Sequence, residues 1–139
     1  MIDKAVRDFL AADATLVAML GTFTGAPAIF VQGDVPPTFD RGDDPYVVLQ
    51  DGESGGYLDG ERDFFSVPID VLVLGRDVGD AAAVEAAAWR VRALLDGASL
   101  SPTGYTNAGT AIASGPSPDD PDDLTFGRRL RAIVGLIEQ

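Results

Sequence analysis

The sequence predicts an α+β fold in which a mainly antiparallel β-sheet has helices packed on one face, as a two-layer sandwich. Two stretches, one at the N-terminus and one after residue 80, have the apolar spacing of amphipathic helices. Several apolar runs have strand character, and most are joined by loops too short or too irregular for parallel crossovers. At 139 residues, the chain is expected to form a single domain, residues 1–139.

The first quarter of the chain predicts two short helices and a strand. The first helix is indicated by apolar residues at helical spacing: Ile2, Ala5, Val6, Phe9 and Leu10. Asp13 is expected to cap a second helical segment that ends at Gly21. The stretch TFTGAP is expected to be a turn-rich connector, and residues 28–32 a short strand. Residues 33–44, with two adjacent prolines and several acids, predict a long exposed loop.

The middle of the chain predicts two strands around a glycine-rich loop. Residues 45–50 form the first strand, DGESGGYLDGE the loop, and residues 64–74 the second strand. One face of the second strand is expected to carry Val67, Ile69, Val71 and Val73, and the other Pro68, Asp70, Leu72 and Leu74. Because Pro68 lacks a ladder donor, it favours an edge or a bulge at that end.

The remainder of the chain predicts a helix from Ala81 to about Asp96, which Gly97 closes. A weak strand near 106–114, an acidic loop GPSPDDPDD and a long strand at 124–137 follow. On the long strand, alternation places Arg128 with Leu130 and the other even-numbered residues. It places Arg129 and Arg131 on the opposite side, with Ile133 and Ile137.

The helix after residue 80 has two unlike faces. Its apolar stripe comprises Val84, Ala87, Ala88, Val91, Leu94 and Leu95. Its back carries Trp89 among Ala82, Ala86 and Ala93. A solvated helix seldom shows such a face, so we expect either a loop of the same chain or another subunit to cover it. We interpret these four residues, with Arg129 and Arg131, as subunit-interface candidates.

Composition argues against most catalytic chemistry. The chain has no cysteine and no histidine, so it offers no thiolate, no zinc knuckle and no serine–histidine triad. The net charge of −12 repels phosphate backbones, so tight non-specific binding to nucleic acid is not expected. No apolar run reaches the ~18–20 residues of a membrane span, and the N-terminus lacks the pattern of a signal peptide. We predict no catalytic residue, cofactor, metal or membrane partner.

Three local patterns have some of the features of a binding site. Gly55 and Gly60 have the spacing of a phosphate-binding loop, but Glu61 and Arg62 stand where that loop needs Lys and Ser or Thr. The acidic clusters 40–44 and 119–123 lack the alternation of a calcium loop, so solvated loops are expected there. The arginines of the last strand are too few for a nucleic-acid stripe and are expected to pair with carboxylates.

Six segments that cover most of the chain follow one another in a recognisable order: AADATLVAMLG, IFVQGDVPP, PYVVLQ, FSVPIDVLVLGRD, AAAVEAAAWRVRALLDG and TFGRRLRAIVGL. This order resembles the tail terminator, or tail completion, proteins of long-tailed phages and related gene-transfer particles. The Pro-Tyr-Val-Val strand and the helix end RVRALLDG are the most telling pieces.

The resemblance implies a structural protein of the virion with no cofactor and no reaction. It implies a ring, expected to be a hexamer, at the head–tail junction, built in the host cytoplasm. This ring would stop the tail tube, contact the major tail tube protein and a neck or stopper protein, and let DNA pass without specific binding. Two long loops would suit docking, with Asp34, Phe39, Asp40, Arg41, Tyr57 and Arg62 as docking-loop candidates.

Three alternatives remain open from the sequence. The first is another head–tail connector, such as a stopper or an adaptor. The second is a carboxylate-based, metal-dependent hydrolase that uses two of the aspartate clusters. The third is a plain protein-binding domain that works as a monomer or a dimer.

Overall fold

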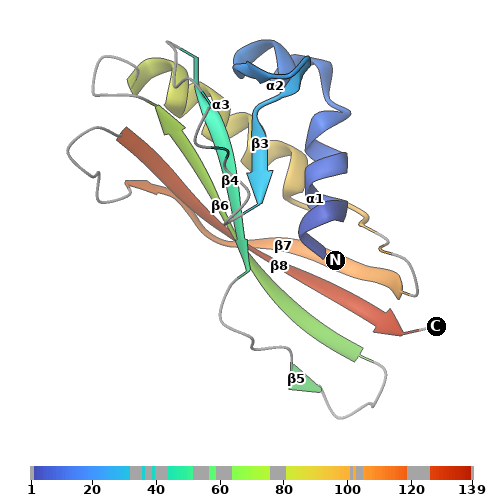
Figure 1. Cartoon of the computed structure of the whole chain (residues 1–139). Helices are drawn as coiled ribbons and strands as arrows, with labels where there is room; N and C mark the ends of the chain where they lie inside the picture. Colours follow the sequence, from blue (N-terminus) through green and yellow to red (C-terminus); the bar gives the residue numbers. More distant parts are fainter. Residues whose placement is uncertain are drawn as a thin grey trace.

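The computed structural model describes residues 2–31, 36, 39, 44–51, 57–58, 64–75, 81–100, 102, 105–118 and 126–138. Within this part, three helices and eight strands follow one another along the chain (Figure 1). Their bounds are α1 Ile2–Ala11, α2 Ala14–Met19, β1 Thr22–Phe23, β2 Ala26–Pro27, β3 Ile29–Val31, β4 Tyr46–Asp51, β5 Tyr57–Leu58, β6 Phe64–Gly75, α3 Ala81–Leu95, β7 Tyr105–Pro118 and β8 Phe126–Glu138.

The main sheet has the strand order β3-β4-β6-β8-β7, and β5 pairs with β6 beside this path. All of its pairings are antiparallel except the one between β3 and β4, which is parallel. The sheet curls, and the three helices pack against it (Figure 1). The predicted fold class is therefore confirmed.

The N-terminal helices form as the sequence predicts. Helix α1 buries Ile2, Val6 and Leu10, which share one face at helical spacing. The side chain of Asp13 accepts a hydrogen bond of 2.8 Å from the Leu16 N–H, and this bond caps α2. The turn expected at TFTGAP is present at Thr24 and Gly25, but the strands β1 and β2 on either side of it, which form a small antiparallel hairpin, were not predicted. Two-residue strands are too short to show an apolar period.

The larger core lies between the sheet and the helices. Its sheet side is made of alternate residues of the long strands: Ile69, Val71 and Val73 of β6, and Leu130, Ala132, Val134 and Leu136 of β8. Helix α3 contributes the predicted apolar stripe, with Val84, Ala87, Ala88, Val91 and Leu95 all buried. Burying a Val or Leu side chain stabilises the fold by about 1.5–3 kcal/mol. This core therefore fixes α3 on the sheet.

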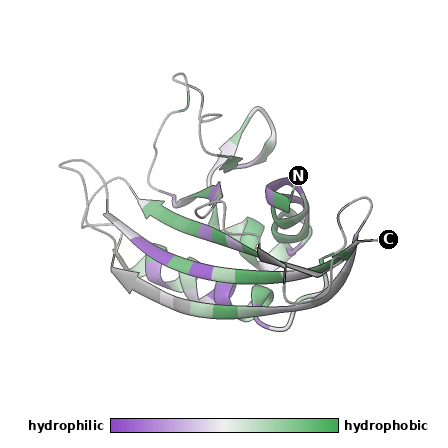
Figure 2. Cartoon of the chain, turned by 90° about the horizontal axis from the view of Figure 1, so that it is seen from below, coloured by the Kyte–Doolittle hydropathy of each residue, from purple (hydrophilic) through white to green (hydrophobic). Residues whose placement is uncertain are grey.

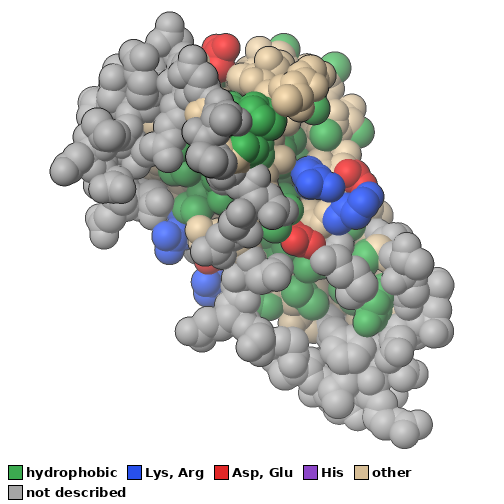
Figure 3. All heavy atoms as spheres, in the orientation of Figure 1, with side chains coloured by type: hydrophobic (Ala, Val, Ile, Leu, Met, Phe, Trp, Pro, Cys, Tyr) green, Lys and Arg blue, Asp and Glu red, His purple; other side chains and the backbone are tan. Residues whose placement is uncertain are grey.

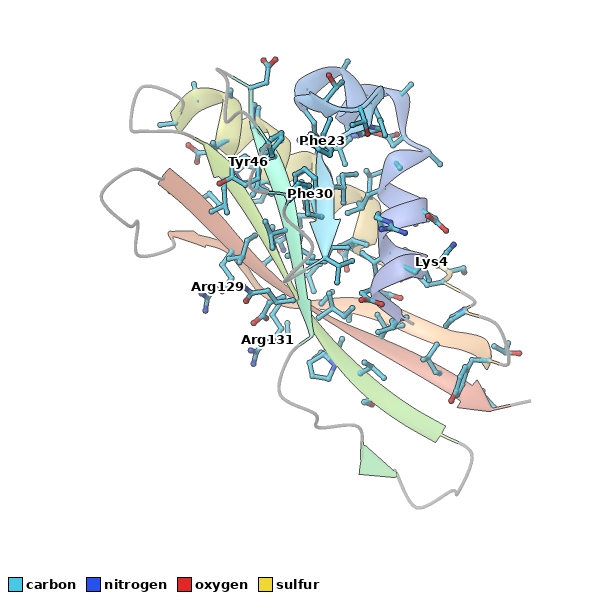
Figure 4. The ribbon with its side chains drawn as sticks, viewed as in Figure 1. Lys4, Phe23, Phe30, Tyr46, Arg129 and Arg131 are labelled. Carbon is cyan, nitrogen blue, oxygen red and sulfur yellow. The ribbon has the colours of Figure 1, made fainter. Side chains whose placement is uncertain are left out.

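A smaller core lies on the opposite side of the sheet, at one end. It contains Ala28, Phe30, Tyr46, Val48 and Leu72, all buried. Phe23 of the hairpin and Phe39 pack against it in edge-to-face contacts, with ring centroids 4.8–6.1 Å apart. The labelled rings gather at this end of the sheet (Figure 4). The hairpin thus covers one end of this sheet face.

Strands β6 and β8 direct their residues to the two sides of the sheet as predicted, but their bounds differ slightly from the predicted ones. Pro68 is paired with Ile133 of β8, but it lies in the gap between the parts of β6 that pair with β4 and with β5. No ladder partner stands on that side of Pro68 within the described residues, which is where a residue without an N–H fits. Strand β6 therefore has a neighbouring strand on both sides where it pairs with β4, and among the described residues only β8 pairs with it at Pro68.

Two predictions of loop bounds are wrong. The glycine-rich loop contains β5, and the first residues of the predicted acidic loop, Gly115–Pro118, belong to β7. Strand β7 is rich in small residues and has three irregularities in its register with β8, which break the alternation that would have revealed it. Hydrophobic colour dominates the middle strands and is interrupted by hydrophilic bands (Figure 2).

Candidate functional site

The outward side of α3 is an exposed apolar surface, which we call the helix face. It is made of Ala82, Ala86, Trp89 and Ala93, and all four are exposed. Trp89 is 50% exposed even though it is the largest residue of the helix. The guanidinium of Arg92 lies 5.3 Å from the Trp89 ring centroid, within the range of a cation–π contact. Glu85 and Asp96, both exposed, border this face.

Two arginines in the C-terminal half of α3 hold the helix in place. Arg90 donates two hydrogen bonds to Asp13, of 3.0 Å and 2.8 Å, so the residue that caps α2 also anchors α3. Arg92 donates a hydrogen bond of 2.9 Å to the Gly115 carbonyl of β7. The hydrogen bonds from Arg90 and from the Leu16 N–H lower the pKa of Asp13, and the bond to Asp13 raises the pKa of Arg90. The helix face is therefore presented on a fixed helix.

The side of the sheet opposite α3 carries a second exposed surface, which we call the sheet face. It is made of Arg129, Arg131, Ile133 and Ile137 of β8, with Asp70 of β6. Arg129 and Arg131 project from the same side of the sheet (Figure 4). Ile133 is half-buried, while Ile137 is 42% exposed. Apolar side chains and arginines thus share this surface.

An ion pair organises the sheet face. Arg131 donates hydrogen bonds of 2.8 Å and 3.1 Å to the two carboxylate oxygens of Asp70, directly across from it in the ladder. The Asp70 side chain is 10% exposed, whereas that of Arg131 is 45% exposed. The bidentate contact therefore fixes the guanidinium while leaving much of it in water. The space-filling view shows Lys and Arg side chains over α1 and beside the sheet (Figure 3).

These pairs show what sequence reasoning missed. Asp13 is predicted as a cap, but its contact with Arg90 spans 77 positions of the chain and follows from tertiary packing. Alternation predicts Asp70 on the face of its strand opposite Ile69 and Val71, and Arg131 on the face of its strand opposite Leu130. Their pairing depends on the register of β6 and β8, which the sequence does not reveal.

The docking-loop candidates are placed unevenly. Asp34, Asp40, Arg41 and Arg62 lie outside the described residues, and for Tyr57 the structure describes the backbone pairing with Ser66. Phe39 is half-buried and packs against Phe23, Phe30 and Tyr46, so its ring is part of the smaller core.

A pocket of about 320 Å³ opens between α1, the hairpin and β3. Arg7 and Asp8 stand among its lining residues, and most of the others are apolar: Ala11, Phe23, Ala26, Pro27, Ile29 and Phe30, with Thr24. Asp8 is already held by Lys4 at 2.7 Å. A single carboxylate engaged in this way does not supply the paired acid and base of a hydrolase.

Metal ligands do not gather in the part of the chain that the structure describes: no group of three Asp or Glu side chains there could hold an ion. Most members of the two acidic clusters, and the Gly55–Gly60 pattern, lie outside the described residues. Among the described helices, none is long and apolar enough to span a bilayer.

Comparison with solved structures finds the same fold in a chain of the virion of a native gene transfer agent particle. The TM-score is 0.78, the match covers 97% of this chain and 93% of that chain, and 24% of the residues are identical. A second solved chain gives a TM-score of 0.55 over 98% of this chain and 94% of its own, at 12% identity. No protein-family model matches the sequence. No curated protein matches it either.

Proposed function

We propose that this chain is a structural virion protein that acts as a tail terminator. Copies would form a ring of six that caps the tail tube and joins it to the neck at the head–tail junction. The observation that carries the proposal is the fold shared with a chain of the gene transfer agent virion over 97% of the length. Fold alone does not assign function, and the resemblance of segments such as PYVVLQ and RVRALLDG points in the same direction.

The body of the molecule suits a ring subunit. A closed ring needs a rigid unit with an adhesive surface on each of two sides, because every copy has two neighbours. The two-layer core supplies the rigid unit, and the helix face and the sheet face lie on opposite sides of it. We propose that these faces contact neighbouring copies, and that the tube protein and the neck protein bind at the ends of the ring.

The proposed role involves no bond-making step. The chain has no histidine and no cysteine, so the side chains that most often act as bases and nucleophiles near neutral pH are missing. Geometry and surface chemistry would therefore do the work.

The charge of the chain fits a ring that DNA must cross without sticking. With 22 acidic residues against 10 basic ones, the average surface repels phosphates. We expect no measurable retention of duplex DNA by the purified protein in a filter-binding assay at physiological salt. Tight binding there would contradict an acidic channel.

Electron microscopy of the purified protein, alone and added to growing tail tubes, tests the proposal. We expect sixfold rings with a central opening, and tubes that stop growing and carry the protein at one end. As a control, an unrelated acidic protein of similar size should leave tube length unchanged. Tubes that elongate equally with and without this chain would overturn the terminator role, and a chain bound along the whole tube would indicate a different structural role.

A further inference from the structure

We infer that neighbouring copies join head to tail, with the helix face of one copy packed on the sheet face of the next. This inference rests on the proposed ring and adds which surfaces meet. It would turn each two-layer subunit into part of a continuous alternation of helix and sheet layers around the ring.

The two faces lie back to back across the same strands. Helix α3 contacts β6, β7 and β8 on one side of the sheet. Arg129, Arg131 and Ile133 stand on the opposite side of β8. The hairpin covers that side only at the end where Tyr46, Val48 and Leu72 lie. The described residues thus leave the other end of the sheet without a second layer.

Each face lacks what the other supplies. A sheet that buries only one of its faces can gain a second helical layer, and a helix with an apolar outer side can gain a second sheet. Trp89 and the alanines around it offer a shallow apolar surface, and Ile133, Ile137 and the exposed Ala111 opposite Ile133 in the ladder offer another. Packing these together removes two exposed apolar surfaces from water at once.

The charges at the borders of the two faces are complementary. Arg129 and Arg131 are exposed on the sheet face, and Glu85 and Asp96 are exposed beside the helix face. The Glu85 Oε2 atom is 4.0 Å from the Arg128 Nη2 atom of its own chain. At this distance the ion pair is weak, so the Glu85 carboxylate can form a shorter contact with a neighbouring copy. Since acids outnumber bases in this chain, two like faces bordered by acids would repel each other. The sheet face of a second copy carries arginines, so it attracts the acidic residues that border the helix face.

Because a helix face and a sheet face are different surfaces, their contact is heterologous. A heterologous contact leaves each copy with one face still available, so it builds a chain of copies that closes into a ring when the rotation per copy allows. Two helix faces packed on each other would close after two copies. The observed arrangement of unlike faces therefore favours a ring over an isolated dimer.

The absence of cysteine allows a direct test by cross-linking. The double variant Trp89→Cys with Ile133→Cys places one thiol on each face, and oxidation or a short bis-maleimide then links only copies in contact. We expect a ladder of covalent dimers, trimers and larger species up to the closed ring. Each single variant should give no ladder, because a chain with one thiol can join to one partner at most.

Control variants make the outcomes decisive. Lys4→Cys with Ile133→Cys places a thiol on the exposed side of α1, whose main contacts are with α2, β3 and β4, and should give no ladder. If Ile133→Cys lowers the melting temperature, Ile137→Cys replaces it, since that side chain is already exposed. Efficient dimerisation of Trp89→Cys alone would overturn the inference, because it would show helix faces packed on each other.

Microscopy of the same samples distinguishes a failure of the face pairing from a failure of the ring. Rings without a Trp89–Ile133 ladder would overturn the face pairing and leave the ring intact. If neither rings nor a ladder form at any concentration, both the face pairing and the ring are overturned.

A charge reversal gives a second, independent readout. Arg129→Glu should lower the yield of the ladder about five-fold or more, the effect expected for losing one favourable contact at an interface. The matched control Arg7→Glu makes the same charge change on α1, outside both faces, and should leave the yield unchanged. Equal effects of the two variants would indicate a response to net charge alone and would contradict the pairing of these faces.

Discussion

Trp89 illustrates how position on a helix decides the role of a large aromatic side chain. The core stripe of α3 is filled by Val, Ala and Leu, and Trp89 lies on the opposite side, 50% exposed. The sequence predicts this placement from the helical period alone. The sequence does not indicate whether a loop of the chain covers the Trp89 ring. In the structure Trp89 is 50% exposed.

Trp89→Ala should therefore weaken association more than folding. We expect assembly to be about tenfold weaker or more, as for aromatic anchors at interfaces, with the monomer changed by about 1 kcal/mol or less from the lost contact with Arg92. Analytical ultracentrifugation measures the first quantity and chemical denaturation the second. Trp89→Phe, which keeps an aromatic ring, should restore part of the association. A collapse of monomer stability would instead make Trp89 a core residue.

Asp13 combines two roles in one carboxylate. It caps α2 through the Leu16 N–H and binds Arg90 of α3 with both oxygens. The sequence predicts the first role, because a capping residue acts locally, and cannot predict the second, because Arg90 comes near only in the folded chain.

The lowered pKa of Asp13 gives a pH-dependent test. The pKa of Asp13 is lower in the folded than in the unfolded chain, so its charge stabilises the fold. This contribution to stability is complete above about pH 3.9 and is lost as the pH falls through the pKa of the folded state. Asp13→Asn keeps a capping side chain but removes the charge. We expect the difference in melting temperature between the parent and this variant to be largest near neutral pH and to shrink below about pH 3.9. Asp8→Asn, in an exposed pair with Lys4, should give a smaller difference. A gap that stays constant with pH would contradict an ionic contribution.

At the scale of elements, β7 depends on a close approach to β8. Gly115 has a φ of +112°, and a Cβ atom there would lie 2.5 Å from the Arg129 carbonyl oxygen and 2.8 Å from the Leu130 Cα. Neither atom can rotate away, because both belong to the backbone of β8.

Gly115→Ala should destabilise the fold by roughly 2 kcal/mol or more, through strain of the backbone together with this overlap. Gly109→Ala is the matched control, because Gly109 also has a positive φ, +130°, but a Cβ there meets no atom within 4 Å. We expect a smaller loss for the control in urea unfolding. Equal losses would show that conformation alone, without the overlap, sets the cost.

The predictable elements were those with a sustained period. Helices α1 and α3 and the faces of β6 and β8 follow from spacing over many residues. The hairpin β1–β2 and strand β5 were missed because each strand has two residues, and β7 was predicted too short because bulges interrupt its alternation. Nothing in the sequence of β3 or of β4 alone indicates that the two strands pair in parallel.

For the whole molecule, the sequence predicts the architecture better than the surfaces. The apolar pattern alone indicates which residues lie inside, and hence which helix side and which sheet side remain outside. How the arginines of the sheet face are held depends on register, as the contact between Arg131 and Asp70 shows. Strand register is a tertiary property, set by packing and turn geometry.

Strand β7 ends the sheet on one side, and two of its carbonyl groups are already occupied. The Gly97 N–H donates to the Thr110 carbonyl at 2.9 Å, and Arg92 donates to that of Gly115. Register shifts also kink the strand at three places. Exposed sheet borders invite uncontrolled strand addition and fibril growth, and bulges or blocked carbonyls discourage it. These features protect this border of the sheet against strand addition from another copy of the chain.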